Sequence, residues 1–170
     1  GTELGMPESA SRVIVALDVP TLSEATDLAR RLAPHLAGVK IGSQLFTAEG
    51  PRAVHVMHDL GLRVFLDLKF HDIPNTVGGA VAAATSLGVW MLNVHASGGP
   101  AMMTAAATGT GGRTLVLGVT VLTSVEEKDL QATLGTVRTL RDHVLHLARE
   151  AKAAGLDGVV ASPHEIADIR

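Results

Sequence analysis

The chain contains no cysteine, few aromatic residues and no long hydrophobic run. Without cysteine, disulfides and thiolate metal sites are excluded. Aromatic residues make up only 2% of the chain, which argues against a nucleic-acid module that stacks bases on side-chain rings. No apolar stretch reaches the roughly 18 residues that a membrane-spanning helix needs. These absences favour a cytoplasmic protein that acts on neither membranes nor nucleic acids.

Length and charge place the chain among ordinary globular domains. It has 170 residues, of which 46% are hydrophobic, enough for one domain with a core. The net charge is −3 and the basic residues are scattered, so no basic stripe marks a nucleic-acid surface. Residues 1–5 lack the basic region and apolar stretch of a signal peptide. We assign residues 1–11 to a vector-derived remnant with a flexible N-terminus, and residues 12–170 to the domain.

Short apolar runs alternate with amphipathic stretches along the chain. The runs are rich in Val, Leu and Ile, as expected for parallel strands buried on both faces. The predicted strands are 13–17, 38–42, 63–70, 91–96, 114–122 and 158–161. The helices predicted with a cap are 23–37 (N-cap Thr21 or Ser23), 77–87 (capped by Asn75 or Thr76) and 136–155 (ending at Gly155).

Alternating strands and helices fit two α/β architectures, a doubly wound sheet and a (β/α)₈ TIM barrel. The first predicted strand is followed by Asp18-Val19-Pro20 rather than by the glycine-rich turn of a dinucleotide-binding sheet. Barrel enzymes place their chemistry at the carboxyl ends of the strands. Polar residues stand at these ends, namely Asp18, Lys40, Asp67, Lys69, His95 and Thr123. The sequence therefore favours the TIM barrel.

The number of predicted strands is too small for a closed barrel. A TIM barrel has eight strands and typically about 250 residues. Roughly six strand–helix units fill this chain, and Arg170 falls inside the helix expected after the sixth strand. We therefore expect a TIM barrel whose C-terminal third is missing from the sequence.

The strand predicted at 63–70 carries two opposite charges. Because side chains alternate across a strand, Asp67 and Lys69 are predicted to share the face that looks into the barrel. Burying either charge alone would cost several kcal/mol, so a purely structural ion pair is one interpretation. Lys40 on the neighbouring strand and Asp72 in the following loop add two more charges. Four alternating charges at one barrel mouth exceed what a structural pair requires and indicate a functional site.

The charged strand and the loop after it resemble the signature of the orotidine 5′-monophosphate decarboxylase family, carboxy-lyases of pyrimidine biosynthesis that make UMP. The matching string is Asp67-Leu68-Lys69-Phe70-His71-Asp72-Ile73-Pro74-Asn75-Thr76. Shorter pieces match in the same order: Leu17-Asp18, Val39-Lys40-Ile41-Gly42, Val94-His95-Ala96 with Gly98-Gly99, and Val121-Leu122-Thr123-Ser124. The similarity extends from about Arg12 to Arg170, and it implies a TIM-barrel enzyme.

The resemblance implies a decarboxylation of orotidine 5′-monophosphate that uses no cofactor and no metal. Lys69 would be the proton donor to C6 of the pyrimidine. Asp67 would lie beside the substrate carboxylate and help to keep Lys69 charged. Lys40 and Asp18 would contact the ribose hydroxyls.

The resemblance also implies a homodimer with shared sites. Asp72 would reach across the interface into the partner's site, and Ile73 and Thr76 would help to line the pocket there. Thr123, with its neighbour Ser124, would lie near the pyrimidine ring. The family's phosphate ligands belong to the missing third, so the sequence assigns none of them.

Two other functions stay open. A Mg²⁺-dependent 3-keto-L-gulonate 6-phosphate decarboxylase of the same superfamily shares the Asp-x-Lys-x-x-Asp pattern, but it has an acid in place of Lys40, and a lysine there would repel the cation. The chain could also be an inactive fragment of the nucleotide decarboxylase. His71 and His95 are conceivable metal ligands, but the histidines form no metal-binding motif, and polar loop or core roles are favoured.

Overall fold

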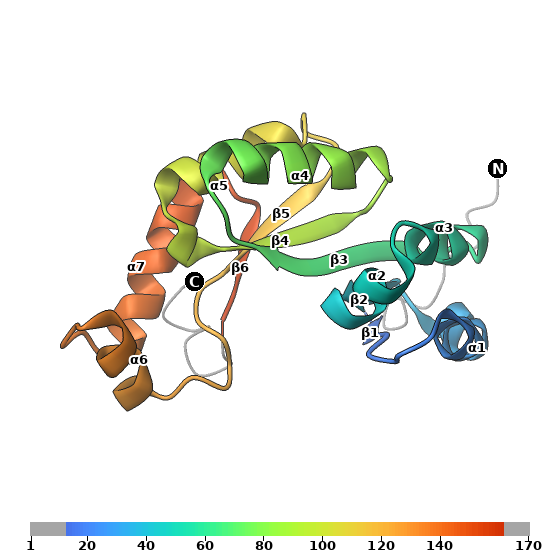
Figure 1. Cartoon of the computed structure of the whole chain (residues 1–170), viewed down its shortest axis with the longest axis horizontal. Coiled ribbons are helices and arrows are strands. Elements are labelled where there is room, and N and C mark those ends of the chain that lie inside the picture. The colour runs from blue at the N-terminus through green and yellow to red at the C-terminus, as the bar shows by residue number, and fades with distance from the viewer. Residues whose placement is uncertain (1–12, 162–170) are drawn as a thin grey trace. The chain divides into compact units, whose positions relative to one another are not determined.

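The computed structural model describes residues 13–161, in which helices alternate with strands (Figure 1). The strands are β1 (Ile14–Ala16), β2 (Gly38–Gly42), β3 (Arg63–Phe70), β4 (Met91–His95), β5 (Leu115–Val119) and β6 (Gly158–Val160). The α-helices are α1 (Leu22–Leu32), α2 (Ser43–Glu49), α3 (Arg52–Asp59), α4 (Pro74–Ser86), α5 (Pro100–Gly109), α6 (Glu127–Leu134) and α7 (Leu140–Ala153). Two 3₁₀ helices are η2 (Ala33–His35) and η3 (Ala96–Gly98).

Within the described residues the strands form one six-stranded sheet in the order β1-β2-β3-β4-β5-β6. The pairs β1–β2, β2–β3 and β5–β6 are parallel. A doubly wound sheet reverses its strand order at a switch point, whereas a TIM barrel keeps its strands in chain order. The sequential order confirms the α/β prediction and agrees with part of a TIM barrel.

The chain divides into two compact units. One comprises Gly1–Leu68 with Ala83–Leu92, and the other comprises Lys69–Ala82 with Asn93–Arg170. The boundary crosses β3 between Leu68 and Lys69. The predicted site residues therefore fall into two groups, one in each unit.

The first unit packs α1, α2 and α3 with β1 and β2 (Figure 1). Helix α1 begins at the predicted N-cap Thr21, whose Oγ1 accepts the backbone N–H of Glu24 at 3.2 Å. At the start of β3, the Arg63 guanidinium lies 4.0 Å from the ring centre of Trp90, a cation–π contact. The core consists of fully buried apolar side chains, among them Val39, Ile41, Val54, Met57, Val64 and Leu66.

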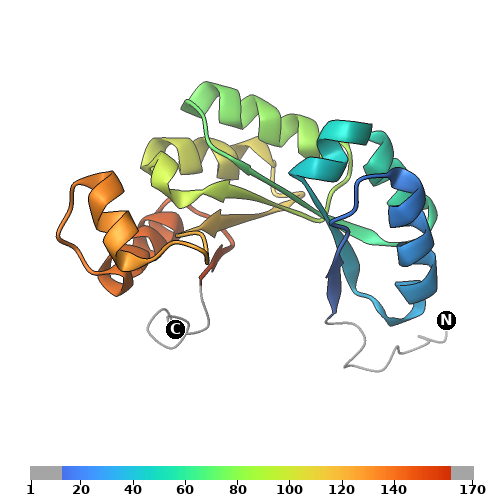
Figure 2. The same cartoon turned by 60° about the horizontal axis from the view of Figure 1, so that its bottom comes forward.

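The second unit packs α5 and α7 with β5 and β6, and Figure 2 shows these elements from a second side. Thr139 caps α7 by accepting the N–H of Asp142 at 3.1 Å. Gly155 follows α7 with φ +89°, a conformation that suits glycine after a helix and agrees with the predicted end. Leu117 on β5 pairs with Gly158 on β6.

Several predicted boundaries are wrong. Helix α4 begins at Pro74, so Asn75 and Thr76 lie inside its first turn rather than capping it. Proline suits this position because the first helical residues need no N–H partner within the helix. Strand β5 ends at Val119, three residues before the predicted end. Helices α2, α3, α5 and α6 have no counterpart among the three predicted helices.

Some predictions fall on residues outside the described range. These are the N-terminal remnant at 1–11 and the helix expected after the sixth strand. Along residues 13–161, no helix combines the length and the apolar character needed to cross a membrane.

Candidate active site

In the first unit, Lys40 and Asp67 meet on two paired strands, Lys40 in the middle of β2 and Asp67 in the C-terminal half of β3. The β2–β3 register sets Lys40 beside Phe65 and Gly42 beside Asp67. The Lys40 Nζ lies 3.4 Å from Asp67 Oδ2. The Asp67 side chain is only 10% exposed, whereas that of Lys40 is 31% exposed. The Lys40 ammonium thus helps to balance the charge of a nearly buried carboxylate, which would be costly to bury alone.

Asp18 lies at the end of the neighbouring strand. The Leu17 N–H donates to the Lys40 carbonyl at 2.9 Å, which extends the β1–β2 pairing to the residue before Asp18. A Cβ atom placed on Gly42 would lie 3.7 Å from Asp18 Oδ1, so this carboxylate stands over a residue with no side chain. Asp18 is exposed. The first unit thus carries two acids and one lysine on or just after three consecutive strands.

In the second unit, Lys69 has an unusual backbone. Its φ is +48°, and it is the only non-glycine residue with positive φ among residues 13–161. A left-handed conformation costs a non-glycine residue about 1–2 kcal/mol because Cβ approaches the backbone. The backbone N–H of Lys69 donates to Asn93 Oδ1 at 2.9 Å. Regular side-chain alternation, from which Lys69 was expected to share a face with Asp67, does not apply at such a residue.

The left-handed backbone predicts an unusual stability order among Lys69 variants. Glycine adopts positive φ without the Cβ penalty, whereas alanine retains it. We expect Lys69→Gly to be more stable than Lys69→Ala by about 1 kcal/mol. Urea unfolding of both variants, with the midpoints compared at equal m values, measures the difference. An alanine variant as stable as the glycine variant would contradict the left-handed assignment.

Asp72, Ile73 and Thr76 lie around the start of α4. All three are exposed, Ile73 to 64%. Asp72 Oδ1 accepts the N–H of Ile73 at 2.7 Å, which fixes the carboxylate just before the helix. A negative charge there is favoured by the helix dipole.

Thr123 lies in the exposed loop between β5 and α6, four residues beyond the end of β5 rather than at the strand end. The rings of His71 and His95 lie with their centres 5.5 Å apart and tilted by 49°. No group of three or more potential metal ligands occurs in the described part of the chain.

Sequence reasoning missed Asn93. It lies in the middle of β4 and is 2% exposed. A buried amide must find hydrogen-bond partners, so one polar residue within the apolar run Met91-Leu92-Asn93-Val94 was a usable signal. The predicted roles of the other residues, and the convergence of Lys69 on Asp67, stay predictions.

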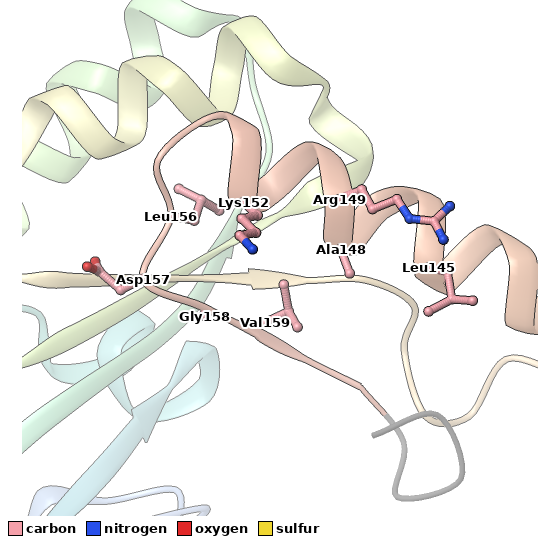
Figure 3. Close-up of a pocket in the computed structure, with 8 residues that line it drawn as sticks. All are labelled: Leu145, Ala148, Arg149, Lys152, Leu156, Asp157, Gly158 and Val159. Carbon is pink, nitrogen blue, oxygen red and sulfur yellow. The ribbon is translucent and has the colours of Figure 1, made fainter. Parts of the chain in front are cut away.

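The hollow between α7 and β6 is a separate feature of the second unit (Figure 3). Its volume is about 490 Å³. Ala148 of α7 and Val159 of β6 point toward one another across it. It is lined by Leu145, Ala148, Arg149, Lys152, Leu156, Asp157, Gly158 and Val159, and thus by none of the predicted site residues. The candidate site is therefore identified by the positions of the predicted residues on the strands, and not by the volume of this hollow.

The chain matches known proteins over nearly its whole length. Residues 11–170 match the model of the orotidine 5′-phosphate decarboxylase / HUMPS family. The orotidine 5′-phosphate decarboxylase of Alcanivorax borkumensis is 52% identical over 159 residues, which are 92% of this chain and 68% of that protein. That of Halorhodospira halophila is 52% identical over 161 residues, 93% of this chain and 68% of that protein. The chain thus spans about two thirds of these relatives.

Solved structures agree with this result. A crystal structure of an uncharacterized conserved protein from Geobacillus kaustophilus matches with a TM-score of 0.85 and 43% identity, covering 92% of this chain and 76% of that one. Orotidine 5′-phosphate decarboxylase from Lactobacillus acidophilus matches with a TM-score of 0.82 and 35% identity, covering 92% of this chain and 74% of that one. By its sequence, its strand order and these matches, the chain belongs to the orotidine 5′-phosphate decarboxylase / HUMPS family.

Proposed function

We propose that this chain is a carboxy-lyase that converts orotidine 5′-monophosphate to UMP and CO₂. Curated relatives with about 50% sequence identity carry the name orotidine 5′-phosphate decarboxylase. The signature string from Asp67 to Thr76 supports the same reaction, because it brings an acid, a lysine and a second acid into ten residues.

Decarboxylation requires a positive charge near C6, where the carbanion develops. The bond between C6 and the carboxylate carbon breaks, its electron pair stays on C6, and a proton must then form the new C6–H bond. The proposal assigns both tasks to Lys69: its ammonium stabilises the electron pair and then donates its proton. Water afterwards returns a proton to the neutral amine.

The ion pair between Lys40 and the nearly buried Asp67 is the observation that carries the proposal. It keeps a carboxylate in the C-terminal half of β3, two residues before Lys69 in the chain. A substrate carboxylate about 4 Å from Asp67 would be repelled by roughly 4 kcal/mol at an effective dielectric near 20. Departure of neutral CO₂ removes that repulsion, so Asp67 would favour the transition state over the bound substrate.

The remaining residues would bind the nucleotide. The Asp18 carboxylate can accept hydrogen bonds from ribose hydroxyls, and the Lys40 ammonium can donate to them. Thr123, in its exposed loop, would contact the pyrimidine. This part of the proposal needs no cofactor.

We also propose a homodimer in which Asp72 acts in the partner's site. Helix α4 contains no charged residue. The small residues Gly79 and Ala82 on α4 are exposed, and so is Ile73, the residue just before the helix. Such a helix can approach another closely without burying charge. Ile73 and Thr76 would then line the shared pocket. The cytoplasmic location stays a prediction.

Metal dependence separates the proposal from its Mg²⁺-dependent rival. We expect the absorbance of orotidine 5′-monophosphate to decay at the same rate with and without EDTA, because the Lys40 ammonium occupies the place where the rival has an acid. The control is 3-keto-L-gulonate 6-phosphate with Mg²⁺, which should not react. Turnover lost in EDTA and restored by Mg²⁺ would contradict the proposal. A sample of the full 17.6 kDa mass that binds UMP yet releases no CO₂ would indicate an inactive fragment.

A further inference from the structure

We propose that Asn93 is a positioning residue for Lys69, an inference that rests on the proposed role of Lys69 as proton donor. Asn93 lies in β4 and is 2% exposed. Its Oδ1 accepts the backbone N–H of Lys69 at 2.9 Å. The side chain of one strand thereby holds the main chain of another at the residue that would do the chemistry.

The geometry of Lys69 explains why a side chain is needed there. In a regular strand, a backbone N–H bonds to a carbonyl of the neighbouring strand. The positive φ of Lys69 turns its peptide group away from regular strand geometry. A backbone N–H in a partly buried place must still be satisfied, and Asn93 supplies the acceptor. The hydrogen bond therefore favours the left-handed conformation and, through it, the direction of the Cα–Cβ bond.

A lysine in this strained backbone conformation indicates a functional role beyond the stability of the sheet. Glycine would adopt this backbone without strain, yet the chain carries a long charged side chain. Non-glycine residues in sparsely populated conformations cluster at functional sites, where the surroundings hold them. The hydrogen bond from the Lys69 N–H to Asn93 Oδ1 provides such a hold on the Lys69 backbone.

The orientation of the Asn93 amide makes the inference testable. A backbone N–H needs an acceptor, so the oxygen and not the nitrogen of the amide faces Lys69. Aspartate at this position keeps an oxygen there, whereas leucine fills a similar volume without an acceptor. The pair Asn93→Leu and Asn93→Asp thus separates the hydrogen bond from simple packing.

Thr110→Val is the matched control. Thr110 is 3% exposed, and its Oγ1 accepts the N–H of Gly112, a residue with φ +77°. The variant therefore also removes a buried side-chain acceptor from a left-handed residue. It does so in the turn before β5, where no predicted site residue lies.

The first readout is kinetic. Misplacing a reacting group by about 1 Å can cost about 100-fold in rate, so we expect kcat of Asn93→Leu to fall by about 100-fold. Its KM and its affinity for UMP should change little, because the ligand contacts remain. Asn93→Asp should recover most of kcat, and Thr110→Val should retain it.

The second readout does not depend on activity. The chain has four lysines, Lys40, Lys69, Lys128 and Lys152, so labelling with [¹⁵N]lysine gives four backbone amide signals. The Lys69 signal is assigned by its loss in Lys69→Arg. In Asn93→Leu it should shift and exchange with solvent faster than in the wild type, while the Lys128 and Lys152 signals stay in place.

Three outcomes would overturn the inference: wild-type kcat in Asn93→Leu, an unchanged Lys69 amide in that variant, or a simultaneous loss of UMP binding and of all four signals. The last would show that Asn93 supports the fold as a whole. Failure of the proposed proton-donor role looks different, because Lys69→Ala would then keep its turnover. The Lys69 amide signal in Asn93→Leu would still test the contact between Asn93 and the Lys69 backbone.

Discussion

Lys69→Ala is expected to lower kcat by at least about 1,000-fold, because the substitution removes the proposed general acid and, with it, the charge proposed to face the carbanion. Nucleotide affinity should remain measurable, since the ribose contacts proposed for Asp18 and Lys40 would be kept. The measurement is the decay of orotidine 5′-monophosphate absorbance together with UMP binding by calorimetry. Retained turnover would contradict the proton-donor role.

Two further variants sharpen this test. Lys69→Arg keeps a positive charge, but the guanidinium does not give up its proton. It should therefore bind UMP and remain nearly inactive, which separates proton transfer from charge alone. Lys128→Ala is the control: that lysine is 79% exposed and pairs only with Glu126, at 3.6 Å, among the ion pairs described. Its turnover should equal that of the wild type.

Mixing two inactive variants is expected to restore activity if the sites are shared. Subunits with Asp72→Ala and subunits with Lys69→Ala should each be inactive as homodimers. In a mixed dimer, one site receives both mutated residues and the other receives an intact Lys69 with the partner's intact Asp72. Random exchange makes half of the dimers mixed, so about a quarter of all sites should recover.

Dimer formation must be shown independently in this experiment. Native mass spectrometry of differently tagged subunits gives the mixed fraction, and activity should rise in proportion to it. Mixing each variant with itself serves as the control. Proven mixed dimers without any recovered turnover would refute the contribution of Asp72 to the partner's site.

The strands in the middle of the chain were predictable because their apolar runs end in clear breaks. Strands β2 and β3 have the predicted limits, and Thr21 caps α1 as one of two candidates. At β5 the apolar run continues past the strand, so hydrophobicity alone misses the end at Val119. The short helices α2 and α3 fall in a stretch where helical periodicity is brief, and they were not predicted.

The candidate site was less predictable than the fold. Placing Lys40 and Asp67 on neighbouring strands followed from the order of the motifs, and the structure brings them to 3.4 Å. The left-handed backbone of Lys69 could not be read from the pattern, because strand alternation assumes regular φ and ψ angles at every residue. Its partner Asn93 is 24 residues away in the chain, and only folding places the two together.

A crystal structure of the chain with bound UMP tests the central claim most directly. We expect the Lys69 Nζ to lie about 3–3.5 Å from C6 of the pyrimidine, the separation of atoms poised to react. Asp67 should lie on the side from which the carboxylate departs. A bound nucleotide whose C6 lies far from Lys69, with the amine directed into solvent, would contradict it.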